Sequence, residues 1–197
     1  MSERKIISIL YASSNQQGNS ALLVDWLLAE GNQEKYEFEK FYLNDLQIEF
    51  FSNENRHVNP MDSGPDSDTR KLIDRIEQAN QVIITTPIWN FGIPGVLKNF
   101  LDRCLALGRI KSGDRRKKVP AWRDKQFYLL FTMGAKWYLA WPNYLGILQT
   151  VFTLWYYGAN VKVLNVVYDC GNGSQVVIAE RSYLQNSLRR KGRKLFR

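Results

Sequence analysis

Five short segments with strand-like patterns divide the chain, four of them apolar and one, 38–43, alternating apolar and charged residues, and a helical pattern separates each one from the next. The predicted strands are rich in β-branched and aromatic residues and lie at 6–11, 38–43, 81–85, 127–132 and 161–168. The predicted helices lie at 21–30, 68–79, 94–107, 144–157 and 174–194. Strands and helices that alternate at this spacing form a parallel sheet with helices on both faces and right-handed crossovers. The sequence therefore predicts an α/β fold.

The size and composition of the chain fit one domain, 1–197, with a substantial core. Of its 197 residues, 45% are hydrophobic and 23% are charged, and there is no repeat or linker. The apolar run after Arg4 and Lys5 is short and leads directly into a loop, so we interpret it as a strand rather than a signal peptide. No apolar run is long enough for a transmembrane span. Two cysteines cannot form a disulfide framework or a Cys-rich metal site, and we expect a cytoplasmic protein.

The positive charge of the chain is concentrated in two segments. Residues 103–125 and residues 181–197 each carry a net charge of +7, so the rest of a chain whose total is +8 carries −6. The basic character thus belongs to an insertion at about 108–125 and to a C-terminal tail, and the fold does not require it. These segments could bind nucleic acid or an acidic membrane. No nucleic-acid motif accompanies them, however, and we interpret them as solvated.

A polar loop with the sequence Ser-Ser-Asn-Gln-Gln-Gly-Asn-Ser follows the first predicted strand, at residues 13–20. It has neither the Gly-Lys-Ser/Thr of a P-loop nor a Gly-x-Gly-x-x-Gly fingerprint, and it contains no Lys or Arg. Its hydroxyls, amides and glycine still suit a phosphate bound by backbone N–H groups at the start of a helix. Asn19 or Ser20 is expected to cap that helix. The alternative is an ordinary strand–helix turn with a Ser cap.

A second loop, at residues 86–94, follows the third predicted strand and suits a flat heterocycle. Its rings and prolines can cover the faces of such a ring, whereas Asn90 and Gly92 can serve the polar edge and allow close approach. The alternative is a packed connection with buried aromatics. Ligands of an open α/β sheet bind beyond the carboxyl ends of the strands, where the strand order reverses. We therefore expect the two loops to hold the two ends of a mononucleotide.

The second loop runs into a helix, and the combined sequence resembles a known family. Residues 87–103 read Pro-Ile-Trp-Asn-Phe-Gly-Ile-Pro-Gly-Val-Leu-Lys-Asn-Phe-Leu-Asp-Arg. With the polar loop 13–20, this stretch is similar to the flavodoxin-like NAD(P)H-dependent oxidoreductases, which include azoreductases, quinone reductases and FMN reductases. The resemblance implies a flavodoxin-like three-layer sandwich, in which a five-stranded parallel sheet of order 2-1-3-4-5 carries helices on both faces.

The same resemblance implies bound FMN, with NADPH or NADH as co-substrate and a small acceptor such as a quinone, an azo compound or free flavin. The residues that would bind the phosphate are Ser13, Asn15, Gly18, Asn19 and Ser20. The residues that would hold the isoalloxazine ring are Pro87, Ile88, Trp89, Asn90 and Phe91. A third loop, where the family often has two glycines, would contribute Thr132, Met133, Gly134 and Ala135. The flavin would carry the chemistry, so we assign no catalytic side chain.

No metal site is expected, because the region at 50–55 lacks the cysteines that hold the iron–sulfur cluster of some family members. Two alternative functions remain. A flavodoxin-type electron carrier would hold flavin without oxidising NAD(P)H, although such carriers are usually strongly acidic. A flavin-free binding protein would instead use the basic segments.

A dense run of aromatic residues lies at 137–157, and we expect it to serve the core and an interface in a homo-oligomer, a dimer or tetramer. Trp137 and Tyr138 could in addition cover the flavin. His57, the sole histidine, is expected in a solvated loop, and Cys104 in the core. Cys170 stands beside a glycine and is interpreted as exposed, with a redox role as the alternative.

Overall fold

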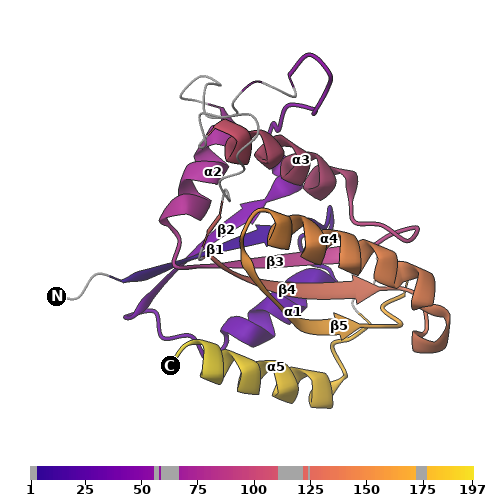
Figure 1. Ribbon diagram of the computed structural model, residues 1–197. Coiled ribbons are helices and arrows are strands. Elements are labelled where there is room, and N and C mark those ends of the chain that lie inside the picture. The colour runs from indigo at the N-terminus through magenta and orange to yellow at the C-terminus, as the bar shows by residue number, and fades with distance from the viewer. Residues whose placement is uncertain (1–3, 56–57, 59–66, 111–121, 124, 172–176) are drawn as a thin grey trace.

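The computed structural model describes residues 4–55, 58, 67–110, 122–123, 125–171 and 177–197 (Figure 1). The strands of its sheet are β1 (Lys5–Tyr11), β2 (Tyr36–Tyr42), β3 (Gln81–Ile88), β4 (Gln126–Met133) and β5 (Asn160–Val167). All neighbouring strands are parallel, and their spatial order is β2-β1-β3-β4-β5. The predicted flavodoxin-like α/β fold is thereby confirmed.

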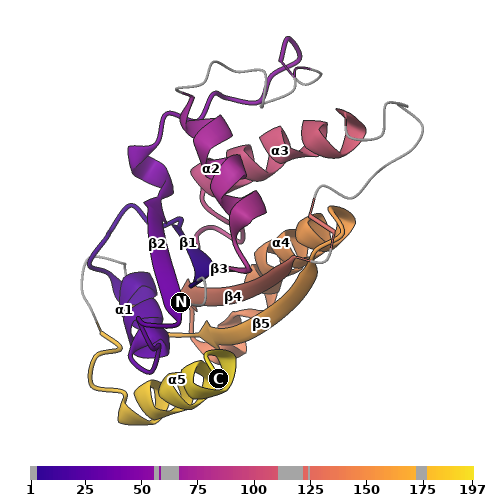
Figure 2. The same cartoon turned by 90° about the vertical axis from the view of Figure 1, so that its left-hand side faces the viewer.

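Helices cover both faces of the sheet (Figure 2). One face carries α1 (Asn19–Leu28) and α5 (Ser182–Leu195), and the other carries α2 (Asp68–Gln78), α3 (Gly95–Ile110) and α4 (Tyr144–Tyr156). Successive residues of a strand point to opposite faces, so Ile9 of β1 packs towards α1 and α5 whereas Leu10 packs on the opposite side. None of the helices in the described ranges is long and apolar enough to span a bilayer.

Most element boundaries differ from the predicted ones by one to three residues, and the end of β3 and the start of α5 differ for reasons that the contacts show. Strand β3 continues to Ile88, because residues 86–88 still pair with β4. Helix α5 begins at Ser182, and the predicted start at 174 is wrong for the described residues 177–181. The Ile178 N–H donates to Asn19 Oδ1 at 3.3 Å, and the Arg181 guanidinium donates to the carbonyls of Tyr168 and Asp169 at 2.7 Å each. These hydrogen bonds hold residues 178–181 in turns, so the helix begins only at Ser182.

Two of the sequence predictions concern residues beyond the described ranges. They are His57 and the greater part of the basic insertion at 108–125. The basic C-terminal segment, 181–197, is described, and it contains the whole of α5. There Leu188 and Gly192 are buried, whereas Arg189, Arg193 and Lys194 are exposed on the opposite side. Most cations of this segment therefore face solvent, whereas Arg181 and Lys191 are half-buried and donate to backbone carbonyls.

The polar face of α3 holds the segment that follows β2. Asn99 accepts a hydrogen bond from the Phe51 N–H at 2.7 Å and donates to backbone carbonyls of the same segment. The fully buried Arg103 donates to Glu49 Oε2 at 3.0 Å and to the Asn55 carbonyl at 3.1 Å. These two residues of the sequence motif 87–103 thus hold residues 48–55 in place.

We predict that Gly192→Ala will destabilise the protein by about 3 kcal/mol, because an added Cβ would overlap the Leu27 carbonyl oxygen and push α5 away from α1. Gly95→Ala is the matched control, since its Cβ would meet nothing within 4 Å. Urea unfolding measures both effects. Equal midpoints for the two variants would show that α1 and α5 do not pack closely.

Candidate functional site

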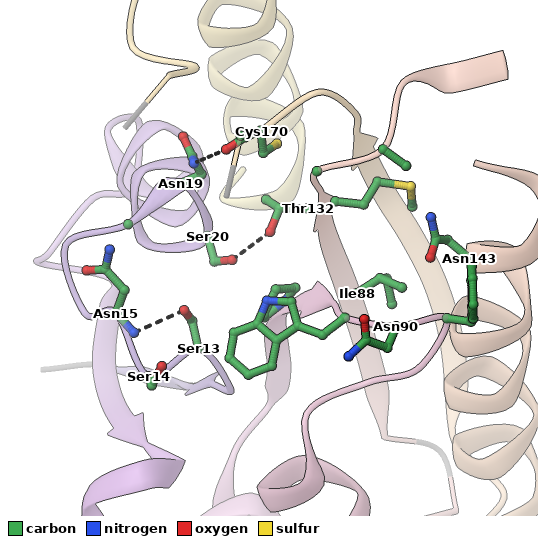
Figure 3. Close-up of a pocket in the computed structure, with 18 residues that line it drawn as sticks. Ser13, Ser14, Asn15, Asn19, Ser20, Ile88, Asn90, Thr132, Asn143 and Cys170 are labelled. Carbon is green, nitrogen blue, oxygen red and sulfur yellow. Dashed lines mark hydrogen bonds between the residues drawn. The ribbon is translucent and has the colours of Figure 1, made fainter. Parts of the chain in front are cut away.

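A cavity of about 550 Å³ lies beyond the carboxyl ends of β1, β3 and β4, on the side where the strand order reverses between β1 and β3 (Figure 3). All fourteen residues nominated from the sequence line it. The structure adds Ser14, Asn143, Cys170 and Gly171. The strand register explains the convergence, because Tyr11 pairs with Thr85, and Pro87 with Thr132, so the three following loops start at neighbouring points.

One side of the cavity is a cradle of polar groups in the loop 13–18. Ser13 Oγ accepts a hydrogen bond from the Asn15 N–H at 3.2 Å, and the Asn15 carbonyl accepts one from the Gly18 N–H at 3.2 Å. Gly18 is the N-cap of α1, and no acidic residue stands in the first turn of that helix. A Cβ at Gly18 would lie 3.1 Å from the Asn15 side chain, so a larger residue would crowd the turn. The positive end of α1 therefore faces this side of the cavity.

Asn19 and Ser20 do not cap α1 as predicted, because their side chains make other hydrogen bonds. Asn19 Nδ2 donates to the Cys170 carbonyl at 3.0 Å, and the hydroxyls of Ser20 and Thr132 lie 2.9 Å apart in a buried pair. Thr85 Oγ1 donates to the Ser20 carbonyl at 2.9 Å. These side chains tie the loops after β1, β4 and β5 to one another.

The second loop forms a tight hairpin around residues 89–92. The Trp89 N–H donates to the Gly92 carbonyl at 2.8 Å, and the Gly92 N–H donates to the Trp89 carbonyl at 2.9 Å. The two central residues have positive φ angles, 47° at Asn90 and 69° at Phe91, as a type I′ turn requires. For a bulky residue such as Phe91 this conformation is strained, and strain of this kind is concentrated at ligand sites.

Helix α4 packs closely against the hairpin. A Cβ at Gly146 would lie 3.1 Å from both the Gly92 Cα and the Phe91 carbonyl oxygen, so only glycine permits this approach. The start of α4 also brings Asn143 to the cavity. Figure 3 shows Asn90 and Asn143 on one side, facing Ser13 and Asn15 across the cavity.

Sequence reasoning missed Asn143, Cys170 and Gly171. Cys170 and Gly171 follow β5, and the rule that ligands bind beyond the carboxyl ends of strands could have indicated them. Gly134 packs on this loop, since a Cβ there would lie 2.8 Å from the Gly171 carbonyl oxygen. Trp137 and Tyr138, in contrast, are absent from the residues that line this cavity.

None of the side chains that line the described cavity carries a charge at neutral pH. Cys170 is buried rather than exposed, and burial raises the pKa of its thiol to about 11. The cavity therefore offers hydroxyls, amides, backbone N–H groups and apolar faces, with no acid or base that titrates near neutrality. Such a site can position a flat ligand that has an anionic end, and it leaves proton or electron chemistry to that ligand.

Comparison with known proteins agrees with this geometry. Residues 5–145 match the model of the family described as NADPH-dependent FMN reductase. The chain belongs to this family. Solved structures similar to this family member include an azoreductase from Bacillus anthracis (15% identical, 98% of each chain, TM-score 0.69) and an NAD(P)H:quinone oxidoreductase from Methanothermobacter marburgensis (17% identical, 99% of this chain and 98% of the other, TM-score 0.72). At these identities the likeness concerns the fold.

Curated relatives match over shorter stretches. An FMN-dependent NADH:quinone oxidoreductase of Beijerinckia indica is 33% identical over 64 residues, 32% of each chain. One of Mycoplasma pneumoniae is 33% identical over 101 residues, 50% of each chain. The chain therefore matches between a third and a half of the length of these two relatives of the FMN reductase family.

We predict that Cys170 of the folded protein will react with iodoacetamide at pH 8 about a hundredfold more slowly than in the unfolded chain, because its raised pKa keeps the thiol protonated. The rate should rise steeply as the pH approaches 11, where the thiolate forms. Mass spectrometry of labelled peptides measures it, with the urea-unfolded chain as control. Rapid labelling of folded Cys170 at pH 8 would contradict its burial.

Proposed function

We propose that this protein is an FMN-dependent oxidoreductase that passes hydride equivalents from NAD(P)H to a small acceptor such as a quinone, an azo compound or free flavin. The observation that carries the proposal is the cavity itself. The cavity has a polar cradle at a helix N-terminus on one side and a hairpin of rings and amides on the other. The chain that forms it belongs to the NADPH-dependent FMN reductase family. The names of the curated relatives and structural neighbours support the same reaction class.

The residues present fit FMN. Ser13, Ser14, Asn15 and the amides at the start of α1 would hold the phosphate, because an anion is stabilised at the positive end of a helix. An uncharged cradle suits a phosphate that stays bound. At the opposite side, Asn90 can hydrogen-bond the polar edge of the ring, and Ile88 can cover a face.

The chemistry that FMN supplies when bound is acceptance of hydride from NAD(P)H and delivery of electrons to the acceptor. The protein contributes position and exclusion of water. Pro87 and Ile88 are largely shielded from solvent, whereas Trp89 and Phe91 are 47% and 56% exposed. The exposed rings can therefore contact a nicotinamide or an acceptor that enters from solvent. We assign no side-chain acid or base to the reaction.

The test is the visible absorption spectrum of the purified protein, supplied with FMN if colourless, before and after anaerobic addition of NADPH and then NADH. We expect a flavin band that bleaches with one or both nucleotides and returns when a quinone is added. A stable yellow protein that neither nucleotide reduces would indicate an electron carrier instead. A protein that binds no flavin would contradict the proposal and favour a flavin-free binding protein.

A pair of variants at Ser14 tests the phosphate cradle within the same proposal. Ser14→Asp places a carboxylate beside the phosphate, and at about 5 Å and an effective dielectric constant of about 20 the repulsion corresponds to at least about a hundredfold loss of FMN affinity. Riboflavin, which lacks the phosphate, should bind the variant and the wild type equally well. Ser14→Asn is the neutral control of similar size. Equal losses for FMN and riboflavin would place the phosphate elsewhere.

We also propose that the protein is a homo-oligomer assembled through α4. Apolar side chains form an exposed stripe along this helix at Leu145, Leu148, Phe152, Trp155 and Tyr156. Contiguous exposed apolar surface of this kind is typical of protein–protein interfaces.

A cytoplasmic location is part of the proposal, supported by two buried free cysteines.

Phe152→Glu should reduce the solution mass to that of the 23.0 kDa chain, because it buries a charge in the proposed interface. Asn186→Glu introduces the same charge at an exposed polar position of α5, outside this stripe, and should leave the mass unchanged. Size-exclusion chromatography with light scattering measures both. A wild type that already elutes as a monomer would contradict the interface.

A further inference from the structure

A second hollow, of about 680 Å³, lies between the loop after β4, the end of β5 and the first turns of α5. It shares no lining residue with the first cavity. The wall between them consists of paired backbone, in which the Asp169 N–H donates to the Ala135 carbonyl and the Cys170 N–H to the Met133 carbonyl, both at 3.0 Å. Figure 1 shows the arrowhead of β5 and the start of α5 on the same side of the molecule.

One wall of the second hollow is held rigidly. Arg181 donates through both terminal nitrogens to the carbonyls of Tyr168 and Asp169, each at 2.7 Å. Asp169 has a φ of 53°, a conformation that few residues other than glycine adopt, and the guanidinium and the bond to Ala135 keep it there. The Tyr168 hydroxyl in turn hydrogen-bonds the Tyr144 hydroxyl at the start of α4. This wall is therefore preformed and does not have to be ordered by a ligand.

The other walls present aromatic rings that the fold leaves uncovered. Trp137 and Tyr138 follow β4 and pack edge to face at 5.8 Å, and Tyr183 lies on the first turn of α5. Trp137 is 73% exposed and Tyr183 is 71% exposed. Large rings that line a hollow can stack on a flat molecule, with about 1 kcal/mol for each ring pair beyond the burial of area.

The charges around the hollow favour an anion. Lys136 and Arg181 line it with one acidic residue, Asp169, so these side chains sum to +1. Arg181 is oriented by its two carbonyl partners, and Lys136 is exposed at the rim. Asn165 and Ser187 add hydrogen-bonding groups on the β5 and α5 sides. Volume, rings and charge together match the pockets that bind small organic molecules.

We propose that the second hollow is a binding site for a planar aromatic anion of one or two fused rings, such as an aromatic carboxylate, and that this ligand binds separately from the flavin cavity. The ring system lies among Trp137, Tyr138 and Tyr183, and the carboxylate faces Lys136. The proposal goes beyond the flavin-dependent reaction and does not require it.

The test is calorimetric titration with 2-naphthoate, on the protein as purified and again with saturating FMN. We expect one site for each chain, with the same affinity in both states, and weaker binding of the neutral 2-naphthamide. Displacement of the probe by FMN would overturn the proposal, because the probe would then occupy the first cavity. Equal affinity for the carboxylate and the amide would overturn it as well.

Variants distinguish binding of the probe at this site from binding to exposed aromatic rings elsewhere on the protein. Tyr183→Ala should weaken 2-naphthoate about tenfold and Tyr183→Phe should retain binding, because the ring and not the hydroxyl makes the contact. Lys136→Gln should remove the preference for the carboxylate. Phe50→Ala, which removes an exposed ring of the segment after β2, is the control and should leave the affinity unchanged. A Tyr183→Ala protein that binds the probe like the wild type, or that changes only its oligomeric state, would overturn the site.

Discussion

The buried hydrogen bonds around Ser20 are the interaction on which the site depends. Its hydroxyl pairs with Thr132, its carbonyl accepts from Thr85, and the adjacent Asn19 reaches the Cys170 carbonyl. Parallel pairing alone brings strand ends to one edge of the sheet, but it does not fix the loops that follow. These bonds do so, because each joins the start of α1 to a different strand end. Buried hydroxyls and amides without such partners would cost about 1–3 kcal/mol each, so the arrangement is strongly preferred.

The absence of charge among the described lining residues of the first cavity follows from this arrangement. A lysine or arginine in the cradle would have to be solvated or paired, and the loop 13–18 uses its polar groups on its own backbone instead. The α1 terminus supplies a positive potential without a side chain, and its capping residue, Gly18, leaves room for a ligand to approach. Affinity for an anion then depends on the placement of backbone amides together with the side chains of the cradle.

Local patterns were sufficient to predict the five strands and the two principal loops, because hydrophobic periodicity and turn chemistry are encoded within short windows. The order of the strands was implied by the resemblance to a known family. They failed where distant residues decide the outcome. The start of α5 is displaced because the Ile178 N–H donates to Asn19 Oδ1 and the Arg181 guanidinium donates to carbonyls of the loop after β5. Asn143 enters the cavity only because Gly146 lets α4 approach the hairpin. The second hollow is formed by three segments that are distant in sequence. Within any one of these segments, an aromatic residue is interpreted as part of an interface or of the core.

The two hollows share a wall of two backbone hydrogen bonds, and this limits how independent they can be. Gly134 lies against the Gly171 carbonyl with no space for a Cβ, so the loops after β4 and β5 cannot slide without a change in the first cavity. Lys136 and Asp169 stand on one side of this wall, and Ala135 and Cys170 on the other. A ligand in the second hollow that moved these loops would change the affinity of the first cavity for flavin. Bound flavin would then change the affinity of the second hollow for that ligand by the same factor. A ligand that binds the preformed wall without moving it leaves both affinities unchanged.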